Sequence, residues 1–399
     1  MAWVATRVPL YLLATGDWKT SSLGPYQGNI IDYQRWYAHY LSHGVFPAHD
    51  QQWQYPPGVA AVFWVPAHLP GGYLRGFVLF TLLADLVILL ALARRARAGG
   101  SWQGCLYWLV AVPLFGPVAL TRYDVVPTAL AVVALLMTGS GTCRGILAGV
   151  GAAIKVWPAV LLVGTPPGQW RRTLAAAVAA GGALTLGYVV FATNATSFLS
   201  FQKARGLEIE AIAATPFLVW RHFGWGGSVT YHYGALQLAG PGTRLAVGAS
   251  LLLTAAAIAG LAAWRLLIAR GRLAWDAEFA TDASLTATLL IVVTSKVLSA
   301  EYMVWLVGVA ACCLAAGKTS QRGVAVLILI AAGLTQVLYP FQFNDLIRGA
   351  DPATSVTVLR NLVLLAATAG SCWLLVRASL NSRNAAVDAR ALPVRRVSA

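Results

Sequence analysis

The chain has 399 residues, of which 58% are hydrophobic and only 11% are charged. A soluble globular domain does not carry so apolar a balance, so the composition indicates a polytopic membrane protein. The net charge of +15 would suggest nucleic-acid binding in a soluble protein. Here the basic residues lie between apolar stretches, so they are interpreted as membrane-topology signals and no nucleic-acid partner is expected.

Apolar stretches follow one another along the chain. The longer ones are long enough, or nearly so, to cross a hydrocarbon core of about 30 Å as helices; they cover residues 73–93, 103–120, 174–192, 245–269, 323–338 and 356–376. Shorter stretches cover residues 1–15, 59–69, 125–138 and 146–163. We therefore expect an all-α polytopic fold of about ten or eleven membrane helices, in a single domain over residues 1–380.

The charges separate onto two sides. One set of loops is rich in arginine, for example at Arg94, Arg95, Arg171 and Arg172, and the positive-inside rule makes that side cytoplasmic. Most acids lie in the other loops, which include two large outer loops, about 16–58 and 193–243. We expect the basic tail, residues 381–399, to be cytoplasmic and disordered.

Counting spans between the two sides gives a parity problem. Either 59–69 or 73–93 must fail to cross fully, and the segment 145–164 must enter the membrane and return on the same side. Half-crossing segments usually line a cavity, because unpaired backbone groups in lipid cost several kcal/mol each. The stretch 200–225, in the second outer loop, is expected to be an amphipathic helix lying on the membrane surface.

Several common chemistries leave no trace in the sequence. The chain has no P-loop, no Gly-x-Gly-x-x-Gly after a strand, no Asp-x-Asp pair and no His-Glu-x-x-His, which disfavours nucleotide-driven reactions and metalloprotease chemistry. His39 and His43 are four residues apart, but two histidines without a third ligand are more often interfacial residues than a metal site. We expect neither a cofactor nor a metal ion.

The most distinctive acid is Asp32, within NIIDYQRWYAHYL in the first outer loop. It forms either a solvated ion pair with Arg35 or a general base whose pKa is tuned by burial and nearby cations. Asp124, in TRYDVVP, is a second outer acid, and a local ion pair with Arg122 is its plainer interpretation. Tyr55, in QYPPG, is a candidate substrate contact.

Charges inside apolar stretches carry a second signal. Lys155, in GAAIKVWP, and Lys296, in SKVLSAEYMVWL, lie within or at the edge of such stretches, where a charge normally faces a cavity, a partner or a ligand. Ammonium and guanidinium groups at membrane depth suit a lipid phosphate. Asp85, in TLLADLVILL, is equally unusual, and the sequence assigns it no partner.

Taken in order, these elements resemble a known family. An early outer loop with an aspartate followed by GVFPAHDQQWQYPPG, then RYDVVP, GAAIKVWP, RGLEIEA and SKVLSAEYMVWL together resemble glycosyltransferase family 87, which includes actinobacterial α-mannosyltransferases with the GT-C fold. The resemblance runs from about residue 17 to about residue 339. It implies a bacterial plasma-membrane enzyme with its active site facing the extracytoplasmic side.

The resemblance also implies roles for particular residues. A hexose, most often mannose, would move with inversion from a polyprenyl-phosphate donor to a lipid-linked or glycan acceptor, with Asp32 as the general base. The donor phosphate would be bound by Lys296 and Arg205, with Lys155 and Arg35 behind them. Sugar or acceptor contacts would come from Tyr55, Asp124, Glu208, Glu301 and Tyr302; Ala300 and Glu301 depart from the family pattern. The alternative is a transporter, a flippase or a non-catalytic binder of a lipid-linked glycan, although no internal repeat typical of a transporter is evident.

Overall fold

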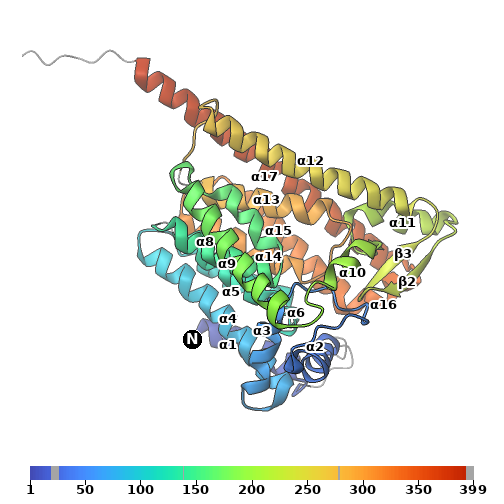
Figure 1. Ribbon diagram of the computed structural model, residues 1–399. Helices are drawn as coiled ribbons and strands as arrows, with labels where there is room; N and C mark the ends of the chain where they lie inside the picture. Colours follow the sequence, from blue (N-terminus) through green and yellow to red (C-terminus); the bar gives the residue numbers. More distant parts are fainter. Residues whose placement is uncertain (19–26, 138, 277–278, 392–399) are drawn as a thin grey trace, which may run out of the picture.

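The computed structural model describes residues 1–18, 27–137, 139–276 and 279–391, and it is predominantly α-helical (Figure 1). The helices of the first half are α1 (Ala2–Thr15), α2 (Gly28–His39), α3 (Val59–Trp64), α4 (Gly72–Arg97), α5 (Gln103–Phe115), α6 (Val118–Thr121), α7 (Val125–Leu136), α8 (Gly141–Ile154) and α9 (Trp170–Phe191). Those of the second half are α10 (Phe198–Ala204), α11 (Thr215–Trp220), α12 (Thr243–Ala269), α13 (Phe279–Thr294), α14 (Tyr302–Ala316), α15 (Arg322–Gln336), α16 (Phe343–Arg348) and α17 (Asp351–Ala391).

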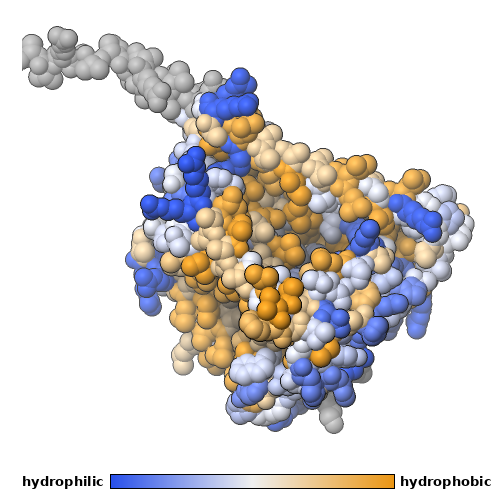
Figure 2. Space-filling model, in the orientation of Figure 1, coloured by the Kyte–Doolittle hydropathy of each residue, from blue (hydrophilic) through white to orange (hydrophobic). Residues whose placement is uncertain are grey.

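Two classes of apolar helix make up the membrane part of the chain. Five helical segments are long and apolar enough to cross a membrane, namely 72–97, 167–191, 243–269, 322–348 and 351–382. Six shorter apolar segments, of 10–17 residues, accompany them among the described residues. Figure 2 shows broad apolar surface over the middle of the molecule with hydrophilic groups toward its ends. The expected all-α, multi-pass membrane architecture is confirmed.

One of the predicted short apolar segments, 59–69, is a short helical segment. Helix α3 and the 3-10 turn that follows it cover only Val59–His68, which at about 1.5 Å per residue is half the thickness of the hydrocarbon core. This segment packs against α4, the full-length span that follows it.

The segment 141–164 changes direction at Lys155. Helix α8 ends beside the start of α7, because Lys155 Nζ lies 2.6 Å from Asp124 Oδ1. Pro158 lacks the N–H that would continue the helix, and the chain proceeds as a 3-10 segment, Trp157–Gly164. Thr165 O then accepts a hydrogen bond of 2.8 Å from Arg265, in the last turns of α12. The segment therefore runs back along α7 to Asp124 and reverses direction there. Its path relative to the membrane stays a prediction.

The two outer loops are joined to each other. Val45 forms an isolated parallel bridge with Thr193, and Gln202 Nε2 donates to Gln54 O at 2.7 Å. Strands β1 (Leu207–Glu208), β2 (Ser228–His232) and β3 (Ala235–Ala239) form a small antiparallel sheet in the order β1-β3-β2, with Leu207 opposite Leu238 and Val229 opposite Leu238.

The amphipathic surface helix expected over 200–225 is wrong. That stretch is divided into α10, β1, a 3-10 turn (Ile212–Ala214), α11 and a second 3-10 turn (Arg221–Phe223). Leu207, Ile209 and Leu218 lie in the protein core rather than on a lipid surface. These apolar residues surround the buried carboxylates of Glu208 and Glu210. The same apolar spacing also fits one face of a surface helix, so the sequence pattern alone did not separate the two arrangements.

Helix α1 is tied to the bundle by a buried ion pair that supplies the missing partner of Asp85. Arg7 donates from Nε (3.0 Å) and Nη2 (2.9 Å) to the two Asp85 carboxylate oxygens. Trp108 Nε1 donates to Asp85 Oδ1 at 2.8 Å, and Trp3 Nε1 donates to Oδ2. Both charged side chains are almost fully buried, so α1 is an integral element of the bundle.

The C-terminal boundary differs from the expected one. Helix α17 continues through residues 381–391 instead of ending near residue 380, and at 41 residues it would be about 60 Å long. Figure 1 shows its last turns extending beyond the bundle beside the end of α12. Residues 381–391 are thus helical in the described structure, and 392–399 lie outside the described residues. The expected cytoplasmic, disordered tail stays a prediction.

Candidate active site

Asp32 is presented on the outward face of α2 because the other face of that helix is buried. Ile30, Tyr33 and Trp36 are each at most 2% exposed, at the three-residue spacing of one helical face. Tyr33 stacks on Phe63 of α3 with ring centroids 4.3 Å apart. This packing fixes the rotation of α2 and leaves Asp32 partly exposed at the surface of the first outer loop.

Arg35 connects Asp32 to a second carboxylate. Its Nη2 lies 3.2 Å from Asp32 Oδ1 and 3.2 Å from Asp50 Oδ2. Asp50 is held in turn by Trp36 Nε1 at 2.7 Å. Burial raises the pKa of Asp32, while the positive charges of Arg35 and Arg122 oppose that rise. The ion pair expected between Asp32 and Arg35 is therefore present. Asp32 also lies within electrostatic range of Arg122, a cation of the buried site described next.

Asp124 and Lys155 form the centre of the buried site. Asp124 precedes the first turn of α7, and its Oδ1 accepts from Lys155 Nζ at 2.6 Å and from Trp305 Nε1 at 2.7 Å. The Lys155 ammonium lies 4.9–5.4 Å from the ring centroids of Tyr123, Tyr302 and Trp305. Such aromatic faces favour a cation, and the surroundings of Lys155 include one carboxylate and three aromatic rings.

Arg122 and Glu301 complete this centre. Arg122 Nε lies 3.8 Å from Glu301 Oε2, and Lys155 Nζ lies 4.0 Å from Glu301 Oε1. Arg122 also donates to Tyr339 Oη at 3.4 Å. The pair distances of 3.8 and 4.0 Å exceed hydrogen-bond range, so the two cations keep donors available for a ligand. The described contacts pair Arg122 with Glu301 and Asp124 with Lys155, rather than Arg122 with Asp124.

The segment around β1 adds a second layer of charge. Arg205 Nη2 lies 3.9 Å from Glu208 Oε2, and Ser299 Oγ donates to Glu208 Oε1 at 2.7 Å. Burial raises the pKa of Glu208, and Arg205 opposes the rise. Arg205 Nε has no hydrogen-bond partner in the described structure. Arg205 therefore keeps one buried donor that its contacts with the protein do not use.

Lys296 is placed differently from the other predicted cations. Its Nζ donates to the carbonyl oxygens of Gln202 (3.3 Å), Lys203 (3.4 Å) and Arg205, at the C-terminal end of α10, where a positive charge is favoured. Burial, and then Arg205, lower the pKa of Lys296. The ammonium thus holds the loop that carries Arg205, and its role as a donor-phosphate ligand stays a prediction.

Tyr55 belongs to the aromatic wall beside these charges. Its ring lies edge-on to Tyr33, Trp53 and Tyr123, with centroids 5.4–6.2 Å apart. Burial raises the pKa of its hydroxyl, and Arg122 opposes the rise. Tyr55 therefore lies within electrostatic range of Arg122, on the path between α2 and the buried centre.

Three charged residues of this region were not among the predicted ligands: Arg122, Glu210 and Arg360. Arg360 Nη1 lies 3.5 Å from Glu210 Oε1, and Arg360 Nη2 donates to Glu210 O at 2.7 Å. Burial raises the pKa of Glu210 to about 8. A usable sequence signal existed for Arg360, because a charge inside the apolar stretch 356–376 requires a partner.

We call these buried residues the charge network. It carries four carboxylates and four cations, which balance each other: Arg122, Asp124, Lys155, Arg205, Glu208, Glu210, Glu301 and Arg360. Counted as fully ionised groups, these charges cancel, which limits the cost of burying them. Below the Glu210 pKa of about 8, protonation of Glu210 leaves the network with a net positive charge. Its unused guanidinium donors also give it capacity for an added anion.

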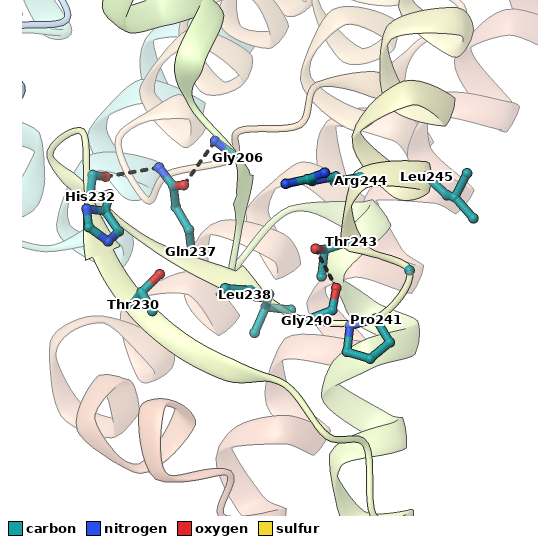
Figure 3. A pocket seen from close by; sticks show the side chains of 12 residues that line it. Gly206, Thr230, His232, Gln237, Leu238, Gly240, Pro241, Thr243, Arg244 and Leu245 are labelled. Carbon is teal, nitrogen blue, oxygen red and sulfur yellow. Dashed lines mark hydrogen bonds between the residues drawn. The ribbon is translucent and has the colours of Figure 1, made fainter.

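A separate hollow of about 650 Å³ lies beside the small sheet, where β3 leads into α12. Figure 3 shows Arg244 extending toward Gly206, while Gln237 bonds Gly206 and the carbonyl of His232 and Leu245 points away. None of the predicted site residues lines this hollow. The candidate active site is therefore the region between α2 and the charge network.

Comparison with known proteins identifies the family of the chain. The model of glycosyltransferase family 87 matches residues 53–295, which is more than half of the chain. No curated protein matches. The crystal structure of ArnT from Cupriavidus metallidurans in the apo state is similar, with a TM-score of 0.48 and 14% sequence identity, covering 92% of this chain and 76% of its own. The chain belongs to glycosyltransferase family 87 and is a multi-pass membrane glycosyltransferase.

Proposed function

We propose that this membrane glycosyltransferase moves a hexose, mannose in the first instance, from a polyprenyl-phosphate donor to a lipid-linked or glycan acceptor. The transfer takes place on the extracytoplasmic face of a bacterial plasma membrane and inverts the anomeric configuration. One observation supports the proposal: Asp32 is a partly exposed carboxylate within electrostatic range of Arg122, and the charge network to which Arg122 belongs has guanidinium nitrogens without hydrogen-bond partners.

In the proposed reaction, the acceptor hydroxyl oxygen attacks the anomeric carbon while Asp32 takes the hydroxyl proton. The bond between the anomeric carbon and the phosphate oxygen breaks, and its electron pair leaves with the polyprenyl phosphate. The phosphate gains one negative charge and needs no proton. Preorganised cations stabilise such developing charge, which is the part proposed for Arg122, Lys155 and Arg205.

The roles proposed for the individual residues follow from their electrostatic effects and ion pairs. Arg122 influences the pKa of Asp32 as well as that of Tyr55, so it is the cation best placed between the proposed base and the network. Arg35 is engaged by two carboxylates and is proposed to set the pKa of Asp32 rather than to bind phosphate. Glu208, Glu301, Asp124 and Tyr302 remain proposed sugar or acceptor contacts.

The deciding experiment is sugar transfer by the purified protein in nanodiscs. Radiolabelled polyprenyl-phosphate mannose would be the donor, and pooled membrane lipids and short mannosides the acceptors. General-base catalysis contributes about 10²–10⁴-fold, so Asp32→Asn should lose that much activity while still binding donor. Asp345→Asn is the matched control, because Asp345 is also an exposed aspartate paired with an arginine three residues later, at 3.6 Å.

The outcomes separate the proposal from its alternatives. Product made by the wild type and the Asp345 variant, but not by the Asp32 variant, supports both the transferase and its base. Equal activity in Asp32→Asn removes Asp32 from the mechanism. A folded wild type that binds donors carrying several different sugars without making product favours a flippase or a silent binder. A chelator should leave the rate unchanged, since no metal ion is proposed.

A further inference from the structure

A second hollow of about 650 Å³ lies at the end of α7 opposite to Asp124. It is formed between the last turns of α4 and the turn from α7 to α8, and Arg94, Arg95, Met137 and Ser140 are among its lining residues. The rest of its wall is largely apolar, with Ala91, Val133 and Leu136. The glycosyl-transfer chemistry proposed above uses no residue of this hollow.

A buried arginine without a counter-charge lies beside it. Arg144, in the first turn of α8, is only 3% exposed, and its Nη2 makes a long contact of 3.4 Å with Met137 O, in the wall of the hollow. Its Nε and Nη1 are buried with no hydrogen-bond partner among the described residues. A single carbonyl does not satisfy a guanidinium with five donors, and an uncompensated buried charge is strongly destabilising.

The other two arginines of the hollow add to this excess. Within the described residues, neither Arg94 nor Arg95 forms an ion pair with a carboxylate, and Arg144 forms none either. Three guanidinium groups thus gather at one end of the bundle, with none of the carboxylate ion pairs of the described residues among them. Arginine is the side chain best suited to a phosphate, which it binds with two parallel hydrogen bonds.

The apolar wall identifies the kind of phosphate. Helix α4, which supplies Ala91, Arg94 and Arg95 to the hollow, also exposes Leu90 (58%) and Val87 (45%) in the preceding turns of the same apolar helix. A soluble phosphate would gain nothing from this surface, whereas a phospholipid would bury acyl carbons against it at about 0.8 kcal/mol per CH₂. Basic pockets between membrane helices are a known arrangement for anionic lipid head groups.

We propose that this hollow binds an anionic phospholipid of the bilayer, with its phosphate on Arg144, Arg94 and Arg95 and its acyl chains along α4. The bound phosphate supplies the counter-charge that Arg144 lacks. The lipid therefore fixes the turn between α7 and α8, and through α8 it supports the position of Lys155 at the other end. The site is distinct from the donor site and does not depend on the function proposed above.

Native mass spectrometry of the delipidated full chain tests the binding step. Phosphatidylglycerol, phosphatidylcholine and inorganic phosphate would each be added to separate samples. We expect retained phosphatidylglycerol, at least tenfold less phosphatidylcholine, and no retained inorganic phosphate. Arg144→Met should lower phosphatidylglycerol retention at least tenfold, and the double variant Arg94→Gln, Arg95→Gln should do so with an unchanged fold. Equal retention of the two lipids, or retention unaffected by both variants, overturns the proposal.

Thermal unfolding in nanodiscs distinguishes this role from simple capping of α7. In pure phosphatidylcholine, Arg144→Met should unfold at the same temperature as the wild type or a higher one, because it removes an unpaired buried charge. Phosphatidylglycerol should raise the unfolding temperature of the wild type and not that of the variant. If Arg144→Met is destabilised equally in both lipids, Arg144 serves only the helix end and the proposal fails. Neither readout involves sugar transfer, so failure of the proposed function leaves this test intact.

Discussion

Replacement of Arg122 by glutamine tests the proposed stabilisation of the leaving phosphate. Arg122 is 17% exposed at its side chain and lies 3.8 Å from the nearest Glu301 oxygen, too far for a hydrogen bond. A phosphate oxygen about 4 Å from this charge, at an effective dielectric constant of about 20, would interact by about 4 kcal/mol. This agrees with the 2.7–4 kcal/mol typically lost with one preorganised donor, or about 10²–10³ in rate.

The effect should appear in kcat, because the phosphate charge grows only as the glycosidic bond breaks. Initial rates of mannose transfer in nanodiscs, at saturating donor and acceptor, would measure it. Arg122→Lys keeps the charge and loses the planar fork, so its rate should lie between those of the wild type and Arg122→Gln. Arg348→Gln is the matched control, since Arg348 also faces an acid but is 77% exposed.

Unpairing Glu301 is the main complication of this variant. The double variant Arg122→Gln, Glu301→Gln removes the carboxylate together with its cation and so leaves the net charge of the network unchanged. It should remain about 10²–10³-fold slow if the guanidinium acts on the phosphate. A folded Arg122→Gln protein within threefold of the wild-type rate would refute the assignment. Recovery of the rate in the double variant would show that Arg122 only neutralises Glu301.

Three further outcomes follow from charges that the structure pairs. Asp85→Ala should cost about 3–5 kcal/mol in detergent-induced unfolding because it leaves the Arg7 guanidinium buried and unpaired, whereas Arg7→Met with Asp85→Leu should cost much less; equal losses would contradict this. Arg35 lowers the pKa of Asp32, so Arg35→Gln should move the acid limb of the pH–rate profile to higher pH, and an unmoved limb would separate Asp32 from that limb. The folded state raises the pKa of Glu210 from 4.5 to about 8. The stability that protonated Glu210 contributes is therefore present below pH 4.5 and is lost as the pH rises through 8, by up to about 1.4 kcal/mol per pH unit. Glu210→Gln should abolish this pH dependence of the unfolding midpoint, measured from pH 5 to 9.

Local pattern predicted most of the fold. Apolar length located the helices, and the predicted short segment 59–69 is a helical segment of ten residues, Val59–His68. The crossings inferred from charge parity stay predictions. Pattern failed where burial came from an unforeseen direction. In the stretch 200–225, the same spacing of apolar residues that would fit a surface helix instead surrounds Glu208 and Glu210, because pattern reports which residues avoid water and not what covers them.

The site was less predictable, for a related reason. Lys155 was recognisable as a charge needing a partner, but the alternatives for Asp124 included its neighbour Arg122, and the structure selects Lys155 instead. Lys296 carries the same sequence signal, yet its ammonium is used by backbone carbonyls. The sequence shows that a charge inside an apolar stretch needs a partner. Whether that partner is a side chain, a backbone carbonyl or a ligand depends on tertiary packing, which the sequence pattern does not report.

The carboxylate of Asp124 also has a history during synthesis. Its two partners lie 31 and 181 residues later in the chain. At about 5–20 residues per second, Trp305 leaves the ribosome roughly 10–35 s after Asp124 does. During that interval Asp124, at the start of α7, can be paired with Lys155 but not with Trp305. The first half of the protein therefore passes through an intermediate in which this carboxylate is only partly hydrogen-bonded. A factor that shields nascent helices at the translocation site would act on this intermediate. Substitutions of Trp305 would therefore lower the amount of folded protein in the membrane before they lower its catalytic rate.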